Sequence, residues 1–189
     1  MKKGLTTTKL IVIGGFAALN VLIELSTSLI TVYSGIPLMS GALTAFIGPI
    51  IGIVFLLTLN TLGAYTIFQL LYSVLILPTH LWGPPGFFPK ILICLIIGLL
   101  IDFSFYYLKK YNKFLTLVLI AFIADFVGTV IFIILGRALN IPGVEKTAYF
   151  ISSPIFILAF VLVAAIDAFV GLKLFNKIKS TSVVMRIQK

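Results

Sequence analysis

Charged side chains are scarce in this sequence. Only 10% of its 189 residues are Asp, Glu, Lys or Arg, against about 25% in an average soluble domain. Hydrophobic residues make up 61% of the chain, and the mean hydropathy is +1.24. Such a chain cannot cover a water-facing surface with polar groups, so lipid must be the solvent for much of it. The composition predicts an all-α, polytopic membrane protein, with no room in these residues for a separate soluble domain.

The chain also lacks the short motifs of common catalytic sites. It has no GxxxxGKS or GxxxxGKT phosphate loop, so we do not expect it to hydrolyse ATP by itself. It has no GxSxG or HExxH motif. The single Cys94 and the single His80 argue against a disulfide framework and a metal cluster. Asp102 and Asp125 lack the sequence context of an intramembrane protease. We therefore expect no enzyme activity, no cofactor and no metal.

Long apolar runs dominate what is present. The stretch 38–77 has no charged residue, and as one helix it would be about 60 Å long, twice the thickness of the hydrocarbon core. It must therefore contain two spans, with a break near the NTLGA segment at Asn60–Ala64. The basic start, Met1–Lys9, is interpreted as leading into a retained first helix rather than a signal peptide. One domain, 1–189, with six transmembrane helices is predicted, at about 10–33, 38–60, 65–77, 88–108, 114–139 and 150–175.

The basic residues predict the orientation of these spans. The net charge is +9, and with six spans most basic residues fall on one side of the membrane, whereas five spans would divide them. The positive-inside rule then places both termini in the cytoplasm of a multi-pass cell-membrane protein. The charge is thus explained without a nucleic-acid partner. The residues on that side are Lys2, Lys3, Lys9, Lys109, Lys110, Lys113, Lys173, Lys177, Lys179, Arg186 and Lys189.

Most unusual residues cluster in Pro78–Asp102, where a proline-rich loop leads into an apolar helix. The loop contains His80 and Trp82, the only Trp, and Lys90 stands at the helix entrance. The predicted orientation places this loop outside. Its aromatic residues either anchor the loop in the membrane interface or line a site for a flat, vitamin-like ligand.

Four of the five acids fall within predicted spans, where each should face protein or water. Asp125 is either a buried structural carboxylate or a ligand contact. Near the outer end of the same span, Arg137 either pairs with a ligand or extends to the interface. Asp102 lies in the inner half of its span and is expected to serve packing or a cytoplasmic-side partner. The four acids are Glu24, Asp102, Asp125 and Asp167.

The first span has two different faces. Asn20 and Glu24 are four residues apart on one polar face, and Gly14 and Ala18 form a small-xxx-small pair roughly 120° away around the helix. Such a pair permits close approach of another helix, either within the protein or from a partner.

Three apolar segments carry a family resemblance: GALTAFIGPIIG at Gly41–Gly52, GPPGFFPKILICLIIGLL at Gly83–Leu100 and AAIDAFVGLKL at Ala164–Leu174. With the six spans, they make the chain resemble the substrate-binding S component of energy-coupling factor (ECF) vitamin transporters. The resemblance implies capture of a vitamin-like small molecule near the outer face, with transport powered by separate ATPase subunits.

The resemblance also implies roles for particular residues. The small-xxx-small pair Gly14 and Ala18 would dock on the transmembrane coupling subunit. The implied substrate-binding candidates are His80, Trp82, Lys90, Asp125, Arg137 and Tyr149. The alternative is a self-sufficient secondary transporter or small channel, against which stands the lack of a detectable inverted repeat.

Overall fold

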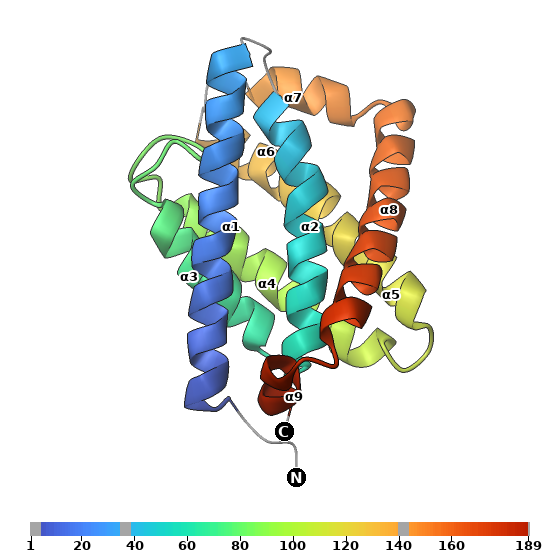
Figure 1. Cartoon of the computed structure of the whole chain (residues 1–189). Helices are drawn as coiled ribbons and strands as arrows, with labels where there is room; N and C mark the ends of the chain where they lie inside the picture. The colour runs from blue at the N-terminus through green and yellow to red at the C-terminus, as the bar shows by residue number, and fades with distance from the viewer. Residues whose placement is uncertain (1–4, 35–38, 140–143, 189) are drawn as a thin grey trace.

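The computed structural model describes residues 5–34, 39–139 and 144–188, and the regular elements in these ranges are all helical (Figure 1). This confirms the all-α fold class predicted from composition. The elements are α1 (Thr7–Ser34), α2 (Met39–Leu59), α3 (Ala64–Ile76), α4 (Pro89–Leu108), α5 (Lys113–Phe122), the π-helix η1 (Ile123–Val127), α6 (Gly128–Ala138), α7 (Val144–Ile151), α8 (Pro154–Ile178) and α9 (Ser182–Gln188).

The helix lengths are those of a membrane protein. Four described stretches are long and apolar enough to cross a bilayer, namely Thr7–Ile30, Pro89–Leu108, Lys113–Ala138 and Pro154–Ile178. The α3 helix has only 13 residues, which is about 20 Å and shorter than a hydrocarbon core of about 30 Å. Neighbouring protein must therefore cover its ends. The break before α3 falls at Asn60–Gly63, as the sequence predicts.

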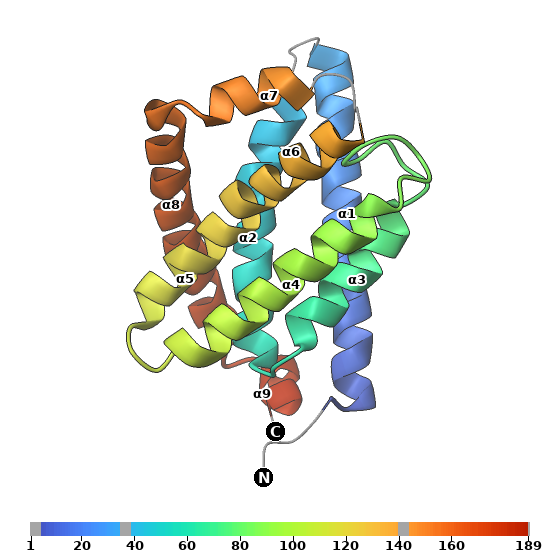
Figure 2. The same cartoon turned by 180° about the vertical axis from the view of Figure 1, so that it is seen from behind.

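The slanted helices α3 and α4 lie side by side and antiparallel (Figure 2). Gly98 of α4 makes this approach possible, because a Cβ there would lie 2.8 Å from the Cα atom of Thr66 in α3. The rings of Tyr65 and Phe68 in α3 pack with the ring of Phe55 in α2, at centroid distances of 4.8–5.8 Å. These contacts form the centre of the hydrophobic core.

Two charged residues of α4 bind the two ends of α3. At the N-terminus of α3, the Asp102 carboxylate accepts hydrogen bonds from the backbone N–H of Thr66 at 2.8 Å and of Tyr65 at 3.3 Å. At the C-terminus, the Lys90 ammonium donates to the carbonyl of Ile76 at 3.3 Å. Each charge has the sign that the helix dipole favours at that end. The structure thus gives Asp102 a capping role within the fold.

The predicted fifth span is a single rod with an irregular centre. Figure 2 shows α5 and α6 as its two halves, and η1 joins them. A π-helical turn adds one residue per hydrogen-bonded ring and frequently occurs at functional sites. The sequence indicated an acid, Asp125, within this span but not the π-helix that contains it.

The connection after this rod and the C-terminal tail hold helices that the sequence did not indicate. Within the predicted loop, α7 precedes α8, which begins at Pro154 rather than at the expected Phe150 because Ser153 is extended. At the other end, α9 buries Val184 and Ile187, and Gln188 donates a hydrogen bond of 3.1 Å to the Leu57 carbonyl. The tail is therefore packed against α2.

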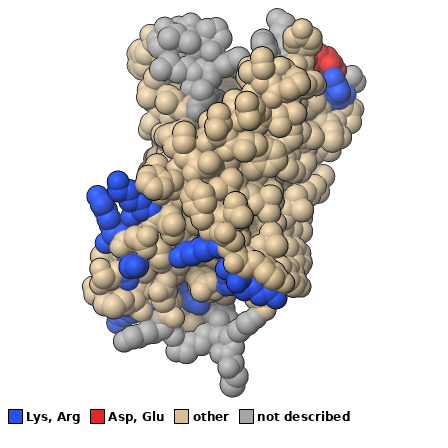
Figure 3. Space-filling view, turned by 90° about the vertical axis from the view of Figure 1, so that its right-hand side faces the viewer, with Lys and Arg blue, Asp and Glu red and all other residues tan. Residues whose placement is uncertain are grey.

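Basic side chains gather at the end of the molecule where both termini lie (Figures 1 and 3). They come from the connection between α4 and α5, from the last turns of α8 and from α9. Lys2, Lys3 and Lys189 lie outside the described residues. The tertiary structure therefore brings together the basic clusters that the sequence analysis assigned to one side.

A substitution at Gly98 tests the close contact of α3 and α4. We expect Gly98→Ala to lower the unfolding free energy by about 1–3 kcal/mol, because its Cβ overlaps backbone atoms of Thr66. Gly14→Ala is the matched control, since a Cβ there meets nothing within 4 Å. Thermal unfolding in detergent, followed by circular dichroism, measures both. Equal unfolding midpoints for the two variants would contradict the described packing.

Candidate functional site

A cavity of about 700 Å³ lies between the helices, within the size range of small-molecule sites. Its wall comes from α1, α2, α3, α4, η1, α6 and α8, together with the loop that follows α3. Its polar lining side chains are Asn20, Glu24, Ser28, Thr44, Tyr65, Gln69, Tyr72, Thr79, His80, Asp125 and Thr129.

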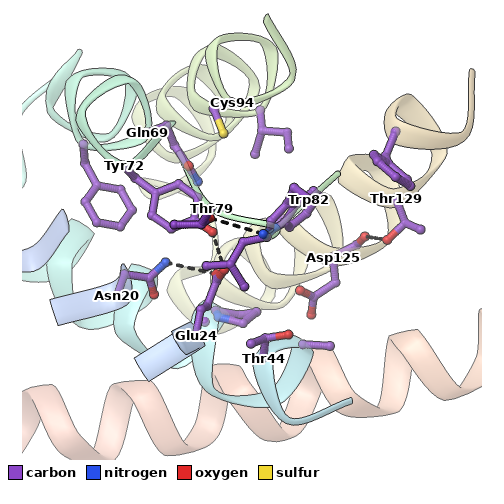
Figure 4. Close-up of a pocket in the computed structure, with 18 of the residues that line it drawn as sticks. Asn20, Glu24, Thr44, Gln69, Tyr72, Thr79, Trp82, Cys94, Asp125 and Thr129 are labelled. Atoms are coloured by element: carbon purple, nitrogen blue, oxygen red, sulfur yellow. Dashed lines mark hydrogen bonds between the residues drawn. The ribbon is translucent and has the colours of Figure 1, made fainter. Parts of the chain in front are cut away.

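Glu24 of α1 is a buried carboxylate at this cavity, with 7% of its surface exposed. The Tyr72 hydroxyl of α3 donates a hydrogen bond to one of its oxygens, and the Asn20 side-chain amide donates to the other at 3.4 Å. These bonds orient Glu24 toward the cavity (Figure 4). Asn20 precedes Glu24 by one helical turn, so the polar pair predicted on one face of the first span is part of the wall.

Asp125 reaches the same space from η1, on another side of the cavity (Figure 4). Its Oδ2 atom is buried and has no hydrogen-bond partner among the described residues. Its backbone carbonyl accepts a bond of 2.6 Å from the Thr129 hydroxyl, one turn further along the rod. The π-helix therefore places Asp125 in the cavity wall, with one buried carboxylate oxygen that has no donor among the described residues.

The loop 77–88 covers the cavity with Trp82. The residue has a φ of 56°, and Gly83 and Gly86 have φ of 115° and 75°. A left-handed conformation is uncommon for a residue with a bulky side chain, and such strain is often found at functional sites. The loop is closed by a hydrogen bond of 2.8 Å from the Gly86 N–H to the Leu77 carbonyl. The indole meets the Phe132 ring edge-on, with centroids 6.3 Å apart.

Lys90 holds the loop in place but does not line the cavity. Its ammonium group is buried, and it donates to the carbonyls of Thr79 at 2.8 Å and Ile76 at 3.3 Å. Thr79 and the neighbouring His80 both line the cavity. Lys90 therefore links the start of α4 to the residues that lead to Trp82.

The structure divides the six predicted substrate-binding residues into two groups. His80, Trp82 and Asp125 line the cavity, whereas Lys90, Arg137 and Tyr149 do not. Tyr149 lies on α7 with 81% of its surface exposed. The resemblance supplied these candidates as a group near the outer face, and only packing could separate those that reach the cavity.

Arg137 makes a surface ion pair. Its guanidinium donates to both carboxylate oxygens of Glu145 in α7, at 3.0 and 2.8 Å, and both side chains are more than half exposed. These hydrogen bonds hold the pKa of the Glu145 carboxyl below its ordinary value. The pair joins α6 to α7 on the outside of the molecule, so Arg137 has a partner in the fold.

Several cavity residues were missing from the sequence prediction. Glu24 and Asn20 were recognised as a polar face but were not assigned to a ligand site. Tyr72 and Gln69 lie in the short third helix, where the sequence offers no charged residue as a signal. The available signal was the spacing of Asn20 and Glu24, an amide and a carboxylate four residues apart within a membrane span. This spacing indicates that the face points into the protein, but not that it lines a cavity.

The predicted docking pair lies on the outside of α1. Ala18 is exposed, Gly14 is partly exposed, and a Cβ at Gly14 would meet no atom within 4 Å. The larger residues Ile11 and Leu22, on the same side, are 71% and 62% exposed. Two small residues thus stand between two large apolar ones on this face, and we refer to Gly14 and Ala18 with these neighbours as the notch. Nothing in the described fold fills this notch, because the buried side of α1 carries Ile13 and Ala17 instead.

Comparisons with protein-family models, with curated proteins and with solved structures found no match to this chain. The cavity and the exposed surface of α1 are therefore the features of the molecule that point to a function.

Replacing Lys90 by Met tests its role in holding the loop. We expect the variant to fold, with the unfolding free energy reduced by about 1–3 kcal/mol, because two backbone carbonyls lose a buried charged donor. The emission of Trp82, the only Trp, should shift to longer wavelength as the loop loosens. Lys177→Met, at an exposed position, is the control. An unchanged emission spectrum in Lys90→Met would contradict the proposed link.

Proposed function

We propose that this chain is the substrate-binding membrane subunit, or S component, of an ECF-type importer. In this proposal, it captures a vitamin-like small molecule at the outer face of the cell membrane and delivers it through a separate coupling module. The observation that carries the proposal is the cavity of about 700 Å³, with two carboxylates and an aromatic loop in its wall. A cavity of this size and composition suits a small polar heterocycle.

The proposed topology has six membrane spans, with both termini in the cytoplasm. The spans are α1, α2, α3, α4, the α5–η1–α6 rod and α8. Basic residues near the ends of α4 and α8 lie at the end of the molecule that holds both termini (Figure 3), and the positive-inside rule assigns that end to the cytoplasm. The short α3 helix is included as a span because α1, α2 and α4 pack against it. The loop 77–88 would then face the outside.

Energy would come from partner subunits. In this proposal, separate ATPase subunits power import through a transmembrane coupling subunit, which agrees with the lack of a phosphate-binding loop in the sequence. The notch at Gly14 and Ala18 offers a membrane-embedded surface for that coupling subunit, because small residues allow two helix backbones to approach closely. The cavity and the notch involve different faces of α1, so ligand and partner would bind without competing.

Co-expression with a coupling subunit and its ATPases tests the complete proposal. We expect the chain to co-purify with them and ATP-dependent uptake to require all components. Native mass spectrometry of the gently purified chain should show a bound small molecule. Association with no coupling subunit, combined with gradient-driven uptake by this chain alone in liposomes, would instead support a self-sufficient secondary transporter.

A bulky substitution in the notch tests docking separately. We expect Gly14→Leu combined with Ala18→Leu to abolish co-purification with the coupling subunit, because the added side chains prevent close helix approach. Occupancy by the co-purified small molecule should stay unchanged. Ala159→Leu, at an exposed position of α8, controls for the extra bulk. If the double variant associates as well as Ala159→Leu does, this face is not the docking surface.

Removing the indole tests whether loop 77–88 recognises the ligand. We expect Trp82→Ala to lower the occupancy of the co-purified molecule about tenfold, because a buried aromatic contact is lost. Phe88→Ala, at an aromatic residue that is 71% exposed and outside the cavity lining, should leave occupancy unchanged. Equal occupancy in both variants would contradict ligand recognition by Trp82 and would indicate that the loop only anchors the protein in the membrane interface.

A further inference from the structure

We propose that the cavity selects an organic cation with a flat, aromatic ring. This inference names the ligand class of the proposed substrate-binding subunit and therefore rests on that function. The observation behind it is the charge balance of the wall: two carboxylates, Glu24 and Asp125, face the cavity, and no Lys or Arg does so among the described residues.

The two carboxylates differ in what the protein already provides to them. Glu24 accepts one hydrogen bond at each oxygen, from Tyr72 and Asn20. The buried Oδ2 atom of Asp125 accepts none from the described residues. A buried, ionised oxygen without a donor is costly, and a cationic partner removes that cost. Asp125 therefore marks the place for the positively charged or N–H-bearing part of the ligand.

The nearest candidate cations of the chain are held elsewhere by the fold. Lys90 directs its ammonium group to the backbone carbonyls of Ile76 and Thr79. Arg137 pairs with Glu145 on the surface. Neither lines the cavity, so no Lys or Arg of the described residues pairs with Glu24 or Asp125 there, and the imidazole of His80 is the one basic side chain in the wall.

A backbone acceptor adds to this preference. Pro49 lies inside α2 and has no N–H, so the carbonyl of Ala45 lacks its usual helical donor. Ala45, Gly48 and Pro49 all line the cavity. The carbonyl that lacks its helical donor therefore belongs to a residue of the cavity wall. An anionic ligand would meet the two carboxylates in the same wall.

The aromatic lining suits a flat cation. Trp82 and Phe132 meet edge-to-face beside the cavity, and Phe160 lines it from α8. A cation over an aromatic face gains about 0.5–2 kcal/mol, most when it is shielded from water. A delocalised ring cation satisfies both requirements, because the ring packs on Trp82 while the charge faces the carboxylates. An aliphatic ammonium ion could also lie over an aromatic face, but it has no flat ring to stack on Trp82.

Three probes of nearly the same shape and different charge test the assignment: 1-methylnicotinamide (cation), nicotinamide (neutral) and nicotinate (anion). Their dissociation constants are measured by saturation-transfer NMR on the full chain in nanodiscs, with empty nanodiscs subtracted. We expect 1-methylnicotinamide to bind about tenfold more tightly than nicotinamide and nicotinate to bind more weakly than either.

The variant Asp125→Asn separates charge recognition from a structural role. It should weaken 1-methylnicotinamide about tenfold and leave nicotinamide nearly unchanged, removing the preference. Glu145→Gln, which removes an exposed acid outside the cavity, is the matched control and should keep the preference.

Four results would overturn the cation assignment. They are no binding of the cation, equal binding of all three probes, preference for the anion, and an equal loss for all probes in Asp125→Asn. None of these affects the proposed importer role, which is decided by association with the coupling module and by ATP-dependent uptake.

Discussion

The hydrogen bonds from α4 side chains to both ends of α3 are the interaction on which the rest of this structure depends. A 13-residue helix is too short to place its ends in water on both sides of a membrane, and lipid offers no hydrogen bonds. Asp102 accepts from the first N–H groups of α3, and Lys90 donates to a carbonyl in its last turn. Gly98, between them, lets the two helices touch. Two N–H groups and one carbonyl of α3 are thereby bonded by charges of the sign that the helix dipole favours at each end.

The same arrangement creates the cavity. Because α3 ends early, the chain can turn back as the loop 77–88, and Lys90 fixes the first residues of that loop. Trp82 is thereby held against Phe132 and over the space between α1 and η1. The cavity is therefore bordered by the paired helices α3 and α4 and by the π-helix η1, which joins α5 to α6.

The intramembrane acids illustrate how differently one residue type can be used. Asp102 is satisfied by the backbone of α3 and serves folding. Glu24 is oriented by two side chains but faces the cavity, whereas Asp125 has an oxygen with no donor among the described residues. A place in the cavity wall, together with hydrogen bonding, separates Glu24 and Asp125 from Asp102, because Asp167 is buried without a donor among the described residues but does not line the cavity. The proposed preference for a cation follows from this difference.

The sequence alone determined that the chain is an all-α membrane protein, where its long apolar helices lie, and that its third helix is short. These properties depend on composition and on local runs of residues, because lipid requires long, internally hydrogen-bonded helices. It also gave His80, Trp82 and Asp125 as binding candidates, since polar or aromatic residues stand out in an apolar chain, and these three line the cavity. Only the tertiary structure decided that Lys90 binds backbone carbonyls, that Arg137 pairs with Glu145, and that Glu24 and Tyr72 meet at the cavity. Those contacts join residues from different helices, and their partners are set by packing between helices, which no local pattern encodes.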